Sequence, residues 1–127
     1  PSTMQKGPKY KNVLLDIYDF FEKRIHKFHD KKIVLDPGIG FGKNLKQNLK
    51  LVKDISLFHS LGVSILLGAS RKSFISKISK NALENERLGG SISSVLYALE
   101  QGVQIFRVHD VLETRQAIDV YNQIKSA

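Results

Sequence analysis

The sequence contains no cysteine, and it has few acidic residues beside its basic ones. The absence of cysteine excludes a disulfide scaffold and a thiolate metal site, and it suits a reducing compartment, so we expect a cytoplasmic location. No apolar run approaches the ~20 residues that a membrane helix needs, so we expect no membrane association. The first six residues, PSTMQK, lack the apolar core of a signal peptide. Because the chain starts with proline rather than methionine, we expect it to come from a longer protein.

The chain has 127 residues, enough for one modest domain and too few for two. Its hydrophobic fraction of 42% and charged fraction of 25% are those of globular proteins and exclude a disordered or collagen-like chain. The net charge of +8 is unevenly distributed: residues 1–53 contain twelve basic and five acidic residues, whereas residues 54–127 contain eight and seven. This excess favours an anionic partner such as nucleic acid, an acidic membrane surface or a phosphorylated metabolite.

Helical and strand-like patterns alternate along the chain. Apolar residues three and four positions apart predict helices, and short aliphatic runs that stop at Gly, Pro or Asp predict strands. The expected order is helix 10–28, strand 33–35, helix 45–59, strand 65–67, short helix 73–79, loop 81–85, helix 88–99, strand 103–108 and a last helix through 117–124.

The spacing of the predicted strands indicates an α/β fold. Strands that start at 33, 65 and 103 are 32 and 38 residues apart, which is typical of βα units with parallel strands and right-handed crossovers. About three parallel strands alternating with helices cannot close a sheet, so we interpret residues 1–127 as a single partial domain, the C-terminal half of a TIM (β/α)8 barrel. A small open three-stranded sandwich is the alternative.

Reactive polar residues follow each predicted strand. Asp36 ends the first strand, residues 70–73 (SRKS) follow the second, and Arg107 and His109 lie at the third. Because parallel α/β sheets bind ligands at the carboxyl ends of their strands, we expect these residues to share one site.

The first of these loops is rich in glycine. Residues 36–43 (DPGIGFGK) match neither a P-loop, which needs glycine at Pro37 and Ser or Thr at Asn44, nor the dinucleotide pattern, whose third glycine would come one residue later. Two interpretations remain open. The loop either lets the backbone approach a flat ligand on which Phe41 packs, or it is a turn capped by Asp36.

The other two loops carry the cations. Residues 70–73 place two cations and two hydroxyls before a helix and favour an anion or a carbonyl, although a solvated basic turn capped by Ser73 is the alternative. Arg107 and His109 are two apart, so their side chains share one face and suit pyrophosphate. Asp110 points the other way, and we expect it to form a capping box with Glu113. We expect solvated or satisfied side chains at the remaining candidates, Lys43, Lys46, Lys50, Lys53, His26, His29 and His59.

Four motifs in order resemble those of dihydropteroate synthase, an enzyme family of the folate pathway. They are DPGIGFGK (36–43), GASRKS (68–73), ERLGGS (86–91) and RVHDV (107–111). The resemblance covers essentially the whole chain and the second half of the family's fold. It implies a TIM-barrel transferase that joins 4-aminobenzoate to 6-hydroxymethyl-7,8-dihydropterin diphosphate and releases pyrophosphate, with no protein nucleophile.

The resemblance also implies roles for individual residues. Asp36, Lys72, Gly68 and Phe41 would bind the pterin; Arg107, His109 and Ser70 would bind the diphosphate; and Phe41, Ser73 and Gly40 would border the 4-aminobenzoate, in the subsite that sulfonamides occupy. The family uses Mg²⁺, whose protein ligand would lie in the N-terminal half, so we expect no metal ligand in this chain. We further expect a homodimer, and no activity from this half alone.

Two other functions are alternatives. The pterin-binding barrel of methyltetrahydrofolate methyltransferases handles no diphosphate, which disfavours it given Arg107, His109 and the 70–73 cluster. A basic, non-enzymatic nucleic-acid-binding module would use the charge of residues 1–53. The lysines there are scattered over predicted helix surfaces without an aromatic stacking platform, so we expect no nucleic-acid partner.

Overall fold

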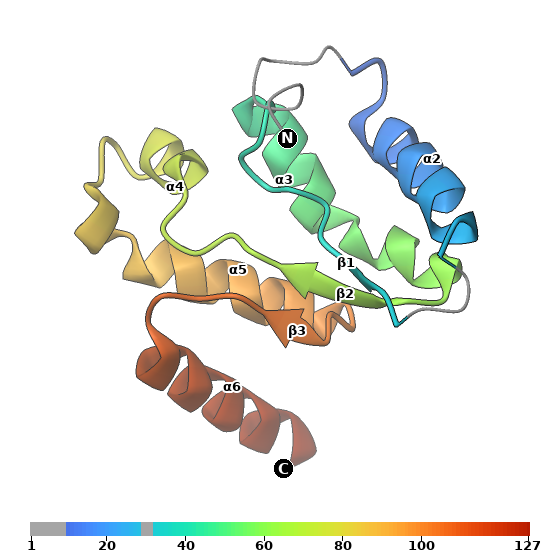
Figure 1. Cartoon of the computed structure of the whole chain (residues 1–127). Helices are drawn as coiled ribbons and strands as arrows, with labels where there is room; N and C mark the ends of the chain where they lie inside the picture. The colour runs from blue at the N-terminus through green and yellow to red at the C-terminus, as the bar shows by residue number, and fades with distance from the viewer. Residues whose placement is uncertain (1–9, 29–31) are drawn as a thin grey trace.

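Three short parallel strands and the helices between them form the fold. The computed structural model describes residues 10–28 and 32–127. In chain order the elements are α2 (Val13–His26), β1 (Val34–Leu35), α3 (Leu45–Lys53), the 3-10 helix η1 (Ile55–Leu61), β2 (Ser64–Leu67), α4 (Ser73–Ile78), the 3-10 helix η2 (Glu84–Glu86), α5 (Leu88–Glu100), β3 (Ile105–Phe106) and α6 (Val111–Ser126) (Figure 1).

The strands pair in the order β1-β2-β3, and both pairs are parallel. This confirms the prediction of about three parallel strands alternating with helices. Strand β3 is shorter than predicted. Of the expected strand 103–108, only Ile105 and Phe106 pair with β2.

Polar side chains define where α2 and α3 begin. Asn12 precedes α2 and its side chain accepts a hydrogen bond from the backbone N–H of Leu15. Asn44 and Gln47 form a reciprocal capping box at the start of α3. Each cap satisfies backbone N–H groups that have no partner inside the helix.

The predicted helix 45–59 is interrupted at Asp54. There α3 ends, and η1 continues as a 3-10 helix to Leu61, before Gly62 with a φ of 76°. A 3-10 helix places residues three apart above one another, so Ile55 and Phe58 both face the core, and each is 0% exposed. The change of helix type therefore serves core packing.

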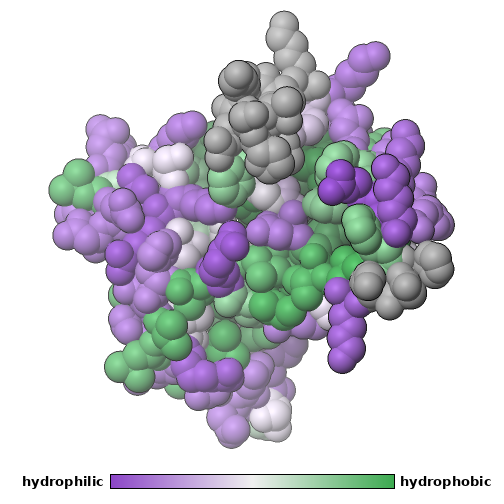
Figure 2. All heavy atoms as spheres, in the orientation of Figure 1, coloured by the Kyte–Doolittle hydropathy of each residue, from purple (hydrophilic) through white to green (hydrophobic). Residues whose placement is uncertain are grey.

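The helices cover one face of the sheet and leave the other open. Leu35, Ile65 and Leu67 point towards the helices and are at most 1% exposed. On the opposite face Val34 is 52% and Ile105 37% exposed. Figure 2 shows hydrophobic side chains gathered near the centre of its view. Since parallel sheets are normally covered on both sides, this chain forms an incomplete layer, as half of a barrel would.

Among the helices of the described ranges, none has the length and apolar character to cross a bilayer.

Gly89 and Gly90 offer a matched test of packing in the first turn of α5. A Cβ at Gly90 would lie 2.5 Å from Cγ2 of Ile75, a buried and stiff β-branched side chain, whereas a Cβ at Gly89 would meet nothing within 4 Å. Gly90→Ala is expected to lower the free energy of unfolding by about 1–3 kcal/mol through overpacking. Gly89→Ala is expected to raise it by about 0.5 kcal/mol, because alanine has the higher helix propensity. Urea denaturation measures both, and equal effects would contradict the packing described here.

Candidate functional site

The ends of the three strands bring Asp36, Gly68 and Arg107 together. Leu66 pairs in register with Ile105, so Gly68 and Arg107, each two residues further on, lie on the same uncovered face. Nη2 of Arg107 donates to Oδ2 of Asp36 at 3.3 Å. A Cβ at Gly68 would lie 2.9 Å from that Nη2, so the glycine leaves room for the guanidinium to cross β2.

Lys72 reaches the same cluster from the loop after β2. Its Nζ donates to the carbonyl oxygen of Ile39 and lies 4.7 Å from the centre of the Phe41 ring. Burial lowers the pKa of Lys72 below its usual range, Asp36 opposes this shift and Arg107 adds to it. The expected convergence of the acid, the loop cation and the strand-end arginine is therefore confirmed.

Ser70 and His109 form a second pair beside this cluster. Oγ of Ser70 lies 2.9 Å from Nδ1 of His109, and it accepts the backbone N–H of His109 at 3.2 Å. Ser70 is buried whereas His109 is exposed. The buried hydroxyl therefore sets the orientation of an accessible imidazole at the end of β3.

Ser73 is less closely joined to the others. It is the first residue of α4, its side chain is exposed, and its carbonyl accepts from Oγ of Ser76. Within the described ranges no hydrogen bond joins its side chain to Gly40 or Phe41. The alternative in which Ser73 caps the helix is wrong, because the N-cap residue is Lys72 and no side chain caps the helix.

The expectation that the side chain of Lys43 is solvated is wrong. Its Nζ donates to the carbonyl oxygens of Gly38 at 2.7 Å and Phe41 at 2.9 Å, which ties the glycine-rich loop to itself. The pKa of Lys43 is lowered to about 8, chiefly by burial and also by the charge of Lys72, while Asp36 opposes the shift. The available signal was its position at the end of the glycine-rich motif rather than on the helix surface.

The glycine-rich loop is held by two groups besides Lys43. Asp36 caps it, since Oδ1 accepts the backbone N–H of Gly38 at 2.9 Å, which confirms the interpretation of a turn capped by Asp36. The approach of a flat ligand to this loop stays a prediction. Asn48 of α3, which sequence reasoning missed, accepts the N–H of Gly40 at 2.8 Å and is only 4% exposed. An asparagine facing the core from an amphipathic helix was the available signal.

Asp110 does not form the expected capping box with Glu113. No side chain caps α6, and the Asp110 carboxylate instead accepts from Nε and Nη2 of Arg71 at 3.2 and 2.8 Å. This two-pronged pair holds the pKa of Asp110 below its usual range and raises that of Arg71, chiefly through the hydrogen bonds between them. A charged donor is a stronger partner than a backbone N–H, which explains the difference.

The cluster suits an anion rather than a cation. Lys43, Lys72 and Arg107 surround a single carboxylate, that of Asp36, which already accepts two hydrogen bonds. Within residues 10–28 and 32–127, no group of three or more His, Asp or Glu side chains is placed to hold a metal ion. These residues do not fit a magnesium site by themselves.

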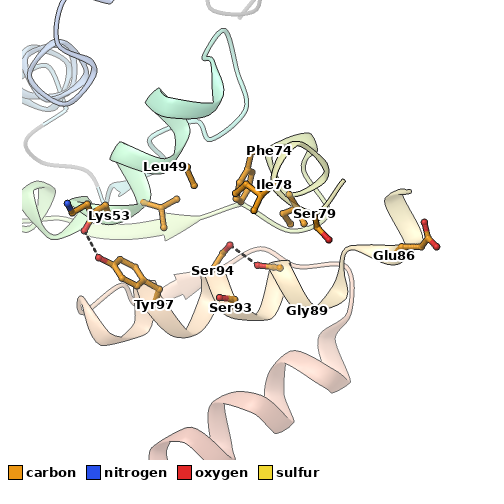
Figure 3. Close-up of a pocket in the computed structure, with 13 residues that line it drawn as sticks. Leu49, Lys53, Phe74, Ile78, Ser79, Glu86, Gly89, Ser93, Ser94 and Tyr97 are labelled. Carbon is orange, nitrogen blue, oxygen red and sulfur yellow. Dashed lines mark hydrogen bonds between the residues drawn. The ribbon is translucent and has the colours of Figure 1, made fainter. Parts of the chain in front are cut away.

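A cavity lies on the helical side of the fold, away from the strand ends. It has a volume of about 620 Å³ and opens between α3, α4 and α5. Figure 3 shows Tyr97, Ser94 and Gly89 of α5 facing Leu49 of α3 and Phe74 of α4. None of the candidate substrate residues lines it, so this groove on the helical side does not contribute to the strand-end site.

Comparison with known proteins places the chain in a family. Residues 1–109 match the family of pterin binding enzymes. Dihydropteroate synthase of Escherichia coli is 40% identical over 100% of this chain and 46% of its own length. The structure of dihydropteroate synthase from Stenotrophomonas maltophilia superposes with a TM-score of 0.92 at 30% identity, over 98% of this chain and 49% of that one. The Thermus thermophilus enzyme in complex with 6HMPPP gives a TM-score of 0.91 at 34% identity, over 98% of this chain and 51% of that one.

The chain thus spans about half the length of the relatives it matches, and its strands and helices superpose on half of a dihydropteroate synthase TIM barrel. It belongs to the pterin-binding enzyme family.

Proposed function

We propose that this chain supplies half of the substrate site of a dihydropteroate synthase, which joins 4-aminobenzoate to 6-hydroxymethyl-7,8-dihydropterin diphosphate. The observation that carries the proposal is the meeting of Asp36, Lys72 and Arg107 at one edge of the sheet. The Thermus thermophilus relative has been crystallised with 6HMPPP and with 4-aminobenzoate, which supports both substrate classes.

The pterin would lie against Asp36, Gly68, Phe41 and Lys72. A carboxylate accepts two parallel N–H bonds, which matches the amino and ring N–H donors of a pterin. Lys72 donates from the other side, where the exposed Phe41 ring offers a face for the flat heterocycle. Gly68 adds no side chain at the point where the ligand and Arg107 approach the strand.

The diphosphate would be held by Arg107, His109 and Ser70. The Arg107 side chain is 61% exposed, so guanidinium N–H groups beyond the one on Asp36 remain accessible to a phosphate. Ser70 fixes the exposed imidazole of His109, two residues after Arg107 in the loop that follows β3. These cations would stabilise the charge that develops on the leaving diphosphate.

The 4-aminobenzoate would be bordered by Phe41, Gly40 and Ser73. Gly40 has a φ of +90°, a conformation that favours glycine, and a Cβ there would lie 3.2 Å from Cδ of Lys72. The bare backbone at Gly40 therefore leaves space for an aromatic ring between the two loops.

The proposed reaction needs no protein nucleophile. The bond between the methylene carbon and the diphosphate oxygen breaks with its electron pair on the oxygen. The arylamine nitrogen then bonds to that carbon and loses a proton. Asp36 stabilises the positive charge on the pterin, and Arg107 and His109 stabilise the departing anion. Magnesium, held by residues outside those described here, would supply further positive charge for the diphosphate.

We also propose that the protein is cytoplasmic and forms a homodimer. Val111, Leu112, Val120 and Ile124 of α6 are between 54% and 77% exposed, which gives the C-terminal helix apolar surface for a second copy.

The first prediction concerns turnover. By itself the chain is expected to release no pyrophosphate from the two substrates and Mg²⁺, because one face of its sheet is uncovered. A chimera in which this chain replaces the matching segment of Escherichia coli dihydropteroate synthase is expected to be active. A pyrophosphate-release assay measures both. An inactive but folded chimera would contradict the proposed function, and turnover by the isolated chain would contradict the dependence on a complete barrel.

A second prediction concerns the diphosphate. In the chimera, Arg107→Met is expected to raise the KM for the pterin diphosphate by about 10- to 100-fold, because it removes hydrogen bonds between charged groups. Arg115→Met is the control, since Arg115 pairs with Asp119 along α6 at 2.7 Å and is equally exposed. Steady-state kinetics at saturating 4-aminobenzoate separates the two variants. An unchanged KM in Arg107→Met would remove this arginine from the diphosphate site.

A third prediction concerns pH. Because burial lowers the pKa of Lys43 in the folded protein to about 8, its side chain is cationic below pH 8 and largely neutral at pH 9. The unfolded chain still binds this proton up to about pH 10.4, so Lys43 adds stability as the pH rises from 8 towards that value. Carbon-13 NMR of labelled lysine in the chimera, with Lys43→Met to assign the signal, should show a midpoint near pH 8. A midpoint near 10.4 would contradict the burial of this amine.

A further inference from the structure

Arg71 has an unusual backbone conformation within residues 70–73, which we call the basic loop. Its φ is 56°, in the left-handed region that non-glycine residues seldom occupy. Such a residue persists only where its surroundings hold it. Arg71 lies between Ser70 and Lys72, so its conformation decides the directions in which these two side chains leave the loop.

Every polar part of Arg71 has a partner. Its backbone N–H donates to Oγ of Ser91 at 2.9 Å, and its carbonyl oxygen accepts from Nη1 of Arg87 at 2.8 Å. Its guanidinium binds Asp110 with two hydrogen bonds. The residue is thus held from the start of α5 and from the start of α6.

The two partners on α5 are themselves fixed. Oγ of Ser91 donates to the carbonyl oxygen of Arg87 at 2.8 Å, and Nε of Arg87 donates to that of Ala82 at 2.9 Å. Ser91 is only 4% exposed. Because a buried serine whose hydroxyl both donates and accepts has little freedom, this end of α5 is a rigid support for the loop.

We propose that Arg87 and Ser91 are positioning residues for the substrate site, because they hold Arg71 in its left-handed conformation and thereby aim Ser70 and Lys72 at the ligand. The inference rests on the proposed function and deepens it. Among the described residues, no hydrogen bond or ion pair joins Arg87 or Ser91 to Asp36, Lys72 or Arg107, so both act through Arg71.

Ser91 and Ser94 form a matched pair for the test. Both lie on α5, and each hydroxyl donates at 2.8 Å to the carbonyl oxygen four residues earlier, Arg87 or Gly90. Only Ser91 also accepts from the basic loop. A comparison of Ser91→Ala with Ser94→Ala therefore isolates the contact with Arg71 from the effect on the helix.

The experiment measures kinetics in the chimera. Ser91→Ala is expected to raise the KM for the pterin diphosphate about 10-fold. Without the serine, the backbone of Arg71 is free before binding, and the entropy lost when the substrate orders this one residue corresponds to about that factor. The kcat should change less than twofold, because no group that touches the reacting atoms is removed. Loss of folded protein alone would instead lower kcat and leave KM unchanged. Arg87→Met is expected to act like Ser91→Ala, and Ser94→Ala to leave KM within twofold of the unsubstituted chimera.

Hydrogen exchange in the peptide 69–74, followed by mass spectrometry, reports the anchor without activity. We expect the Arg71 amide to exchange about 10-fold faster in Ser91→Ala than in Ser94→Ala. A KM for Ser91→Ala within twofold of that for Ser94→Ala would overturn the proposed role, whatever happens to kcat. Equal exchange in the two variants would overturn the anchor itself. An unsubstituted chimera without turnover would instead count against the proposed function, and the exchange measurement would still decide the anchor.

Discussion

The site depends on the parallel pairing of β2 with β1 on one side and β3 on the other. Parallel strands end at the same edge, so three loops separated by more than thirty residues each meet there. The register adds a finer constraint, because it puts Gly68 between Asp36 and Arg107 on one face. Gly68 leaves the space through which the guanidinium passes, since a Cβ there would lie 2.9 Å from Nη2 of Arg107.

Two of the cations at this edge, Lys43 and Lys72, are held by the backbone, whereas Arg107 pairs with Asp36. Lys43 and Lys72 both donate to carbonyl oxygens of the glycine-rich loop, and burial lowers the pKa of each. Asp36 is the carboxylate that offsets part of their repulsion. A site with this balance is preorganised for an anionic ligand, because the work of bringing the positive charges together is done during folding.

Behind the residues that we propose to face the ligand lies a second set of residues that support them. Asn48 holds Gly40, Lys43 closes the glycine-rich loop, and α5 supports Arg71. Asn48 and Ser91 sit on helices α3 and α5, whereas Lys43 belongs to the loop itself. One face of the sheet is open, and the relatives that match the chain are about twice its length. The chain is therefore well ordered as a scaffold for one side of a site.

The sequence by itself determined the alternation of helices and strands, the parallel sheet and the three loops that meet, because hydrophobic period and strand spacing are local and carry the topology. It placed Asp36, Lys72 and Arg107 correctly at one edge for the same reason. Only the tertiary structure decided the partners of individual polar side chains. Lys43 donates to a carbonyl oxygen inside the folded glycine-rich loop instead of facing solvent. Asp110 binds Arg71, which is far away along the chain, instead of capping α6. Such choices depend on distances between side chains, which no local pattern encodes.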